Sequence, residues 1–263
     1  MTEAEPDWQV GRDTEGLPLV RYRRGEREGR PWASALEVLT TGTAGVDGPV
    51  STVDPVEFVL SDMSGWIVSG RVEFGERLLR RGARMLRLGH TMLRDLAGDP
   101  PPAGWPDWAR TPLRDGYRSV PCDRDAEALT PALGAAFGPG HPDHRPDHDA
   151  RTVHEDLRTL LAGRIVGPVL PSSALVVDPD DRVVAGAVVT DFEGVPWIAH
   201  LFRHPDLGYP GLGRDLMRRV MADLAGRGNP EMGLAVTEGN AARGLYTSLG
   251  FRFTRSTMTV VVP

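Results

Sequence analysis

A tight glycine turn between a strand and a helix is the segment of this sequence best suited to chemistry. The apolar run that ends at Arg203 is followed by Gly208, Gly211 and Gly213, and an amphipathic helix begins at Leu212. The first N–H groups of a helix have no intrahelical partner, and they carry the positive end of the helix dipole. The turn is therefore expected to bind an anion such as a diphosphate.

The spacing of this turn argues against two common phosphate-binding motifs. Gly208-x-x-Gly211-x-Gly213 has the reverse order of the dinucleotide fingerprint, and no strand with an acidic end follows at the required distance. A Walker loop needs a lysine, and all 30 basic side chains of this chain are arginines. Two alternatives stay open at this point: a plain strand–helix connector, and a nucleotide- or phosphate-binding protein of another fold.

A second motif follows the glycine turn. The apolar segment 232–236 predicts a strand, Asn240 is suited to cap a short helix, and that helix carries Tyr246 and ends at Gly250. Together with Pro205 and the glycine turn, this segment resembles the GNAT-type acyl-CoA N-acyltransferase superfamily over residues 117–263. The resemblance implies an α/β fold with a mixed, mainly antiparallel twisted sheet flanked by helices.

The resemblance also implies a function: transfer of an acyl group, most simply acetyl from acetyl-CoA, to a primary amine by direct attack in a ternary complex. The glycine turn would hold the diphosphate of coenzyme A, and the strand before it would pair with the pantetheine arm. Asn240 would hydrogen-bond that arm, and Tyr246 would protonate the departing thiolate. The residues expected to bind the coenzyme are Leu201, Phe202, Arg203, Gly208, Tyr209, Gly211, Leu212, Gly213, Arg214, Asn240 and Arg243.

Attack of an amine on a thioester also needs a base for the amine proton. His200 is our first candidate, because an imidazole titrates near neutral pH and lies at the end of the strand 197–202. Glu193 and Asp191 are second choices. Both His200 and Tyr246 have an alternative interpretation as core side chains, since Tyr246 lies on the apolar stripe of its helix.

Two positions depart from the family pattern, which usually has Arg or Gln at the place of Gly208 and often Arg at that of Pro210. Pro210 also removes one N–H group from the turn. These departures keep a second function open: a catalytically degenerate acyl-CoA-binding or regulatory module.

Three consecutive prolines near residue 101 predict a domain boundary within 98–112. We therefore expect a smaller N-terminal domain at 1–110 and a GNAT domain at 111–263. In the second domain the alternation of apolar patterns predicts six or seven strands with helices between them. A capping box of Thr152 and Glu155 is expected to start one of these helices.

The N-terminal part has weaker patterns. Segment 82–87 resembles 250–255, each follows a short amphipathic helix, and each leads into a strand with a Thr-Met pair. We interpret residues 66–94 as a degenerate half-repeat of the second domain without the glycine turn, with chance similarity as the alternative. The arginine cluster at 21–30, diluted by glutamates, indicates a solvated face in preference to a polyanion site.

The loop 138–149 is rich in His, Asp, Pro and Gly. Its His and Asp spacing is compatible with a metal site, but no cysteine accompanies the loop and its prolines and glycines indicate an irregular surface segment, so we predict no metal. The matching loop in the family borders the acceptor cleft, and Asp143, Asp147 and Asp149 are expected to attract a cationic amine. The single cysteine, Cys122, is expected to pack without a nucleophilic role.

Composition restricts the partners. A net charge of −6 disfavours nucleic acid, and the absence of a long apolar run disfavours a membrane. The expected partner is an amine acceptor, either a small molecule or a peptide, and a homodimer is left open. Without a secretion signal the expected location is the cytoplasm.

Overall fold

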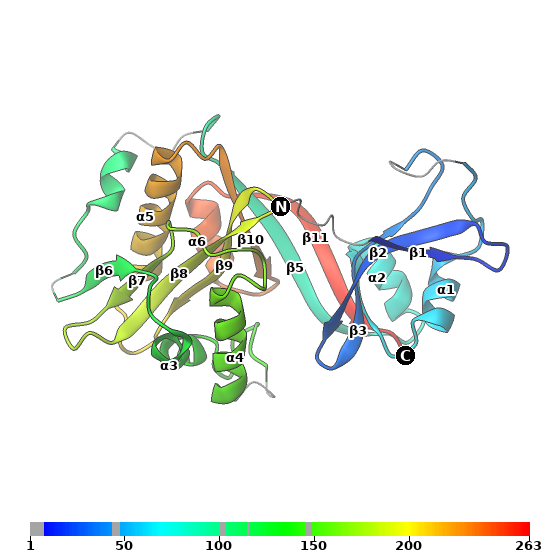
Figure 1. Ribbon diagram of the computed structural model, residues 1–263, viewed down its shortest axis with the longest axis horizontal. Coiled ribbons are helices and arrows are strands. Elements are labelled where there is room, and N and C mark those ends of the chain that lie inside the picture. Colours follow the sequence, from blue (N-terminus) through cyan, green and yellow to red (C-terminus); the bar gives the residue numbers. More distant parts are fainter. Residues whose placement is uncertain (1–7, 44–47, 100–103, 115, 146–148) are drawn as a thin grey trace. The chain divides into compact units, whose positions relative to one another are not determined.

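A computed structural model describes residues 8–43, 48–99, 104–114, 116–145 and 149–263 (Figure 1). The strands are β1 Trp8–Arg12, β2 Pro18–Arg27, β3 Arg30–Val38, β4 Ile67–Arg71, β5 Arg84–Asp95, β6 Arg118–Pro121, β7 Ala174–Val177, β8 Val183–Phe192, β9 Val195–Arg203, β10 Glu231–Thr237 and β11 Arg252–Val261. The helices are α1 Pro55–Asp62, α2 Val72–Leu79, α3 Ala126–Ala136, α4 Ala150–Leu161, α5 Leu212–Gly226 and α6 Ala242–Ser248, with a short 3-10 helix at Trp105–Ala109.

The fold is α/β with a mixed, mainly antiparallel sheet, as expected. Its described strands follow the order β1-β2-β3-β4-β11-β5-β10-β9-β8-β7-β6, which makes eleven strands where six or seven were expected. The difference comes from the N-terminal part, which forms five strands of its own from segments with weak periodicity.

The chain divides into two compact units. The first contains the described residues up to His90 together with Arg255–Pro263, and the second is Thr91–Thr254. These ranges differ from the expected 1–110 and 111–263 because the divisions fall inside β5 and β11, two long strands that each begin in one unit and end in the other.

The second unit is built around an antiparallel meander. β6 pairs with β7, β7 with β8 and β8 with β9, all antiparallel, and β9 then pairs in parallel with β10. The residues 183–189 of β8 are buried on both faces, as their unbroken apolar run predicted. One face packs on α5 and α6 and the other on α3 and α4 (Figure 1).

Helix α5 buries the predicted apolar stripe against this sheet. Its fully or almost fully buried side chains include Leu212, Leu216, Met217, Val220, Met221 and Leu224. The i, i+4, i+5, i+8 spacing places these side chains on one side of the helix. The stripe therefore fixes the direction in which the N-terminus of α5 points.

The first unit repeats the order of elements of the second. The series β1-β2-β3-α1-β4-α2-β5 matches β7-β8-β9-α5-β10-α6-β11, with two antiparallel pairings followed by one parallel pairing in each. Gly82 and Gly250, which end the last helix of each series, both have a positive φ. This agreement supports the hypothesis of an internal repeat and extends it from 66–94 back to β1.

No helix in the described ranges is long and apolar enough to span a bilayer.

Gly186 lets β8 approach β9 closely, because a Cβ atom there would lie 2.5 Å from Cζ of Phe202 and 2.9 Å from Cδ2 of Leu175. Phe202 is 3% exposed, so its ring has no space to move into. We expect Gly186→Ala to destabilise the protein by ~1–3 kcal/mol through overpacking. Urea unfolding measures this change.

Gly134→Ala is the matched control. Gly134 lies on an exposed part of α3, and a Cβ atom added there would have no neighbour within 4 Å. Alanine is the better helix former, so this variant should gain up to ~1 kcal/mol. Equal effects of the two substitutions would contradict the packing described for β8 and β9.

Candidate active site

Strands β9 and β10 separate soon after they meet. Their parallel pairing joins Trp197 to Gly233 and Ile198 to Leu234 and extends no further. On the other side of β9 the register with β8 shifts here: Val188 pairs with His200 and Val189 with Ile198, so Ala199 is an extra, bulged residue. The later residues of β9 and β10 thus turn unpaired backbone edges toward each other.

The register of β9 shows which of its backbone groups face this gap. The N–H of His204 donates to the carbonyl of Val184 on the β8 side at 2.7 Å. Hydrogen-bonded pairs alternate along an antiparallel ladder, so Phe202 and His200 also turn toward β8. Leu201 and Arg203 consequently direct their N–H and C=O groups away from β8, toward the edge that β10 has left.

In the glycine turn, three N–H groups have no hydrogen-bond partner among the described residues. Residues 203–215 are all described, and within them the N–H groups of Tyr209, Gly211 and Gly213 donate to no acceptor. Gly211 is the N-cap of α5 with a φ of 97°, and no side chain caps the helix. Glycine is suited to this left-handed position. The free donors therefore lie in the turn and at the start of α5, where the helix dipole is positive.

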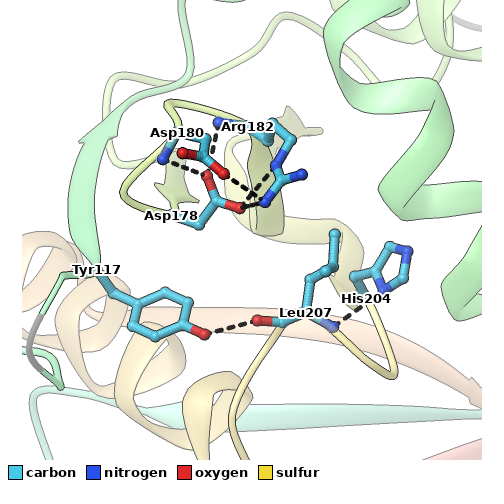
Figure 2. A network of polar contacts seen from close by, with 6 residues as sticks. All are labelled: Tyr117, Asp178, Asp180, Arg182, His204 and Leu207. Carbon is cyan, nitrogen blue, oxygen red and sulfur yellow. Dashed lines mark hydrogen bonds and ion pairs between the residues drawn. The ribbon is translucent and has the colours of Figure 1, made fainter.

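Side chains hold the turn in shape (Figure 2). Nδ1 of His204 accepts from the N–H groups of Asp206 and Leu207, each at 3.2 Å, and Tyr117 donates to the carbonyl of Leu207 at 2.7 Å. The hydroxyl group of Tyr209 donates to Asp215 at 2.9 Å. Figure 2 also shows the β7–β8 hairpin, where Arg182 bridges Asp178 and Asp180 with N–O distances of 2.8 Å.

Beyond the gap, Asp143 joins the loop 138–145 to the end of β10. Its carboxylate accepts from the hydroxyl group of Thr237 and, at 3.2 Å, from the side-chain amide of Asn240. Asn240 in turn accepts from the N–H of Ala242 at 2.8 Å, so it caps the start of α6 as predicted, one residue before the helix's nominal N-cap, Ala241. The sequence drew attention to Asp143 and Asn240 separately, whereas nothing in it distinguished Thr237.

His200 lies half-buried on β9 beside the same loop. Its ring is 6.1 Å from that of Phe137, which makes an edge-to-face contact with His141 at 4.7 Å. Desolvation lowers the pKa of His200, opposed by the negative charges of Asp156 and Asp143. The imidazole is therefore neutral at neutral pH and can accept a proton.

Tyr246 is 7% exposed on α6, next to Phe251. Burial, followed by the charge of Asp143, raises the pKa of Tyr246 to about 12. The raised pKa keeps the phenol protonated at neutral pH and able to donate a hydrogen bond. Leu245 of the same helix lies 4.0 Å from the place of a Cβ atom on Gly213, which brings α6 against the first turn of α5.

Other predicted residues take different places. Arg243 is exposed and pairs with Glu238 at 3.4 Å, and Arg214 is exposed on α5. Of the second-choice bases, Glu193 lies exposed in the β8–β9 turn, and Asp191 accepts from the N–H of Gly194 in the same turn.

Three expectations for the loop 138–149 and its helix can be compared with the structure. Asp149 is the N-cap of α4, where its hydrogen bond with the N–H of Thr152 lowers its pKa, so the predicted capping box was wrong and this carboxylate is occupied by the helix. Asp147 lies outside the described residues. Among the residues described, no three His, Cys, Asp or Glu side chains group as a metal ion would need.

Cys122 is half-buried, and burial followed by the charge of Asp123 raises the pKa of its thiol to about 11. The thiol is therefore protonated at neutral pH and is a poor nucleophile.

Known proteins share this arrangement. Residues 185–260 match the family model described as FR47-like protein. No curated protein sequence matches. A GCN5-related N-acetyltransferase from Sphaerobacter thermophilus superposes with a TM-score of 0.63 at 18% identity, covering 98% of this chain and 81% of that one. This chain has the GNAT-type acyltransferase fold.

Two further similar structures agree. A GCN5-related N-acetyltransferase-like protein from Streptococcus suis gives a TM-score of 0.53 at 12% identity, covering 97% of this chain and 88% of that one. The glucosamine N-acetyltransferase region of a fungal multi-domain GH3 β-N-acetylglucosaminidase gives 0.58 at 12% identity, covering 96% of this chain and 32% of that one. These matches confirm the fold expected from the glycine turn, Asn240 and Tyr246.

The raised pKa of Tyr246 predicts a stability change in alkali. Because its pKa in the folded protein, about 12, lies above the ordinary value, the stabilisation is complete below pH ~10 and is lost as the pH rises toward 12. Between pH 8.5 and 11.5 the wild type should lose about 2 kcal/mol more than Tyr246→Phe, measured by urea unfolding at both pH values. Identical losses in the two proteins would show that Tyr246 is not desolvated.

Proposed function

We propose that this protein transfers an acyl group, most simply acetyl, from coenzyme A to a primary amine. The observation that carries the proposal is the separation of β9 and β10 after Ile198 and Leu234, together with the uncapped N-terminus of α5 that follows β9. His200 and Tyr246 both feel the charge of Asp143, at the end of β10. The N-acetyltransferase descriptions of similar structures support an amine as acceptor.

The residues present fit coenzyme A. A diphosphate needs donors and positive potential, which the N–H groups of Tyr209, Gly211 and Gly213 and the dipole of α5 offer. The pantetheine arm carries amide groups, which match the unpaired backbone edge of Leu201 and Arg203. When bound, the coenzyme would supply the activated thioester.

The chain's own residues then have distinct tasks. An N–H group of β9, from Leu201 or Arg203, would stabilise the negative charge that develops on the thioester oxygen. Neutral His200 would accept the proton of the attacking amine, directly or through water, and protonated Tyr246 would donate to the leaving sulfur. Because the thiol of Cys122 is protonated, direct attack by the amine is preferred over a covalent enzyme.

Activity and binding together test the proposal. Calorimetry with acetyl-CoA should show binding, and an amine panel should reveal at least one acceptor that releases a thiol detected with a chromogenic disulfide. Binding without thiol release from any amine would favour the alternative, a degenerate acyl-CoA-binding module. Binding of ATP or NAD in place of acetyl-CoA would contradict both functions.

Replacement of the proposed base or acid should reduce turnover without affecting coenzyme binding. We expect His200→Gln and Tyr246→Phe each to lower kcat at least ~10-fold, because general acid–base steps contribute ~10²–10⁴-fold. Tyr22→Phe, in the first unit, is the control for loss of a phenol hydroxyl group. Unchanged turnover in either variant would remove that residue from its role.

Asp143 is our candidate for contact with a cationic acceptor. It lies half-buried among Thr237, Asn240 and His141, and its charge acts on both His200 and Tyr246. Asp143→Asn should raise KM for cationic amines ~10-fold or more, because an ion pair in a partly desolvated site is lost. Steady-state kinetics with acetyl-CoA at saturation measures this.

Asp149→Asn is the matched control, since asparagine keeps the N-cap of α4 while the same charge is removed from the same loop region. Equal KM values for Asp143→Asn and the wild type would contradict the assignment of Asp143. A similar rise in both variants would indicate general electrostatic attraction and no specific contact.

A further inference from the structure

The side chain of Arg203 folds back over the glycine turn. Its Nη1 atom donates to the backbone oxygens of His204 at 3.1 Å, Pro205 at 2.9 Å and Gly208 at 2.7 Å. One nitrogen with two hydrogens serves three acceptors, so at least one of these hydrogen bonds is shared. One of its three nitrogens thereby fixes the guanidinium group. Its positive charge also offsets the partial negative charge of carbonyl oxygens that would repel an anion.

Gly208 leaves room for this side chain and for the backbone oxygen of His204, which would lie 3.2 Å from a Cβ atom at position 208. Its φ lies outside the left-handed region, so the backbone conformation is open to other residues. A Cβ atom on Gly208 would lie 2.6 Å from Cγ and 3.2 Å from Cδ of Arg203. The stem of Arg203 therefore occupies the space in which a side chain at position 208 would begin.

The other nitrogens of Arg203 remain available. In the described part of the chain, Nε and Nη2 have no hydrogen-bond partner, and no carboxylate pairs with the guanidinium group, which is partly exposed. An arginine held at one edge and open at the other presents two parallel donors, the arrangement that binds phosphate oxygens. The nearby residue Tyr209 begins the series of free N–H groups.

We propose that Arg203 binds the diphosphate of the acyl donor through its open edge, so that a side chain from the end of β9 supplies the positive charge that position 208 lacks. This assignment rests on the proposed function and goes beyond it, because that function used only the backbone of Arg203. It makes the guanidinium group part of the anion site and Gly208 the residue that leaves room for it.

Ligands with and without a diphosphate distinguish two roles of Arg203: direct contact with the diphosphate, and stabilisation of the shape of the glycine turn. We expect Arg203→Gln to weaken coenzyme A and 3′-dephospho-coenzyme A equally, by ~10–100-fold, since a charged hydrogen bond is lost. Pantetheine, which has no phosphate, should lose less than ~2-fold. Competition binding against a fluorescent acyl-CoA measures all three.

Other binding results would overturn either the assignment of Arg203 alone or the proposed function as well. Equal weakening of pantetheine and coenzyme A would show that Arg203 only shapes the turn, and undiminished coenzyme A binding would show that it does not touch the diphosphate. Either would overturn this assignment while the proposed function stands. A wild type that binds neither coenzyme A nor pantetheine would overturn the proposed function itself, and this assignment with it.

Moving the arginine from position 203 to position 208 tests whether Gly208 is needed to leave room for the Arg203 side chain. Gly208→Ala alone should weaken coenzyme A, because its Cβ atom displaces the stem of Arg203. Arg203→Ala should weaken it more, and the double variant Arg203→Ala with Gly208→Arg should recover at least ~5-fold of that loss. A double variant as weak as Arg203→Ala would contradict the exchange. Thermal melts identify unfolded variants, and Arg203→Lys, expected to retain partial affinity, replaces Arg203→Ala if that variant does not fold.

Discussion

The separation of β9 and β10 is the constraint on which the candidate site depends. Parallel pairing ends at Ile198 and Leu234, and the bulge at Ala199 shifts the register of β9 with β8 at the same point. Backbone N–H and C=O groups need partners, so an open edge inside a sheet either takes up water or receives a ligand with amide groups of its own. Because α5 leaves the end of β9 and α6 leaves the end of β10, the two helix N-termini meet beside the gap, with Gly213 against Leu245. The open strand edge and the proposed anion and proton donors are therefore brought together where the pairing of β9 and β10 ends.

The first unit shows that this order of elements is not sufficient for an anion site. Its helix α1 corresponds to α5 in the repeated series, but Asp54 caps it and accepts from the N–H of Val56 at 2.9 Å. Arg77 pairs with the same carboxylate. A carboxylate at the N-terminus satisfies the donors and the dipole that a phosphate would otherwise use. In α5 a glycine without a side-chain cap stands at the equivalent place, so the N–H donors that Asp54 satisfies in α1 are left open at the start of α5.

Local patterns predicted the part of the site that lies on single elements. The stripe of α5, the glycine turn and the Asn240–Tyr246 helix follow from spacing within short windows, and the structure agrees with each. The contact of Asp143 with Thr237 joins residues 94 positions apart, which no local pattern encodes. The direction of the Arg203 side chain could not be predicted from the sequence either, because it depends on the path of the turn.

The first three strands were not predicted, because arginines at positions 21, 23, 24 and 27 of β2 hide the alternation of polar and apolar residues that is typical of a strand. Cation–π contacts with Trp8, Trp66 and Trp32 accommodate those arginines.

Desolvation sets the protonation of both proposed catalytic groups, and Asp143 adjusts it. Burial alone favours a neutral His200 and a protonated Tyr246. The charge of Asp143 opposes the shift of the histidine and adds to that of the tyrosine, which keeps the imidazole basic enough to accept a proton while the phenol stays a donor. A half-buried carboxylate needs hydrogen bonds of its own, and Thr237 and Asn240 at the end of β10 provide them. The end of β10 therefore has two effects: it leaves the edge of β9 open, and it supplies the donors that hydrogen-bond to Asp143.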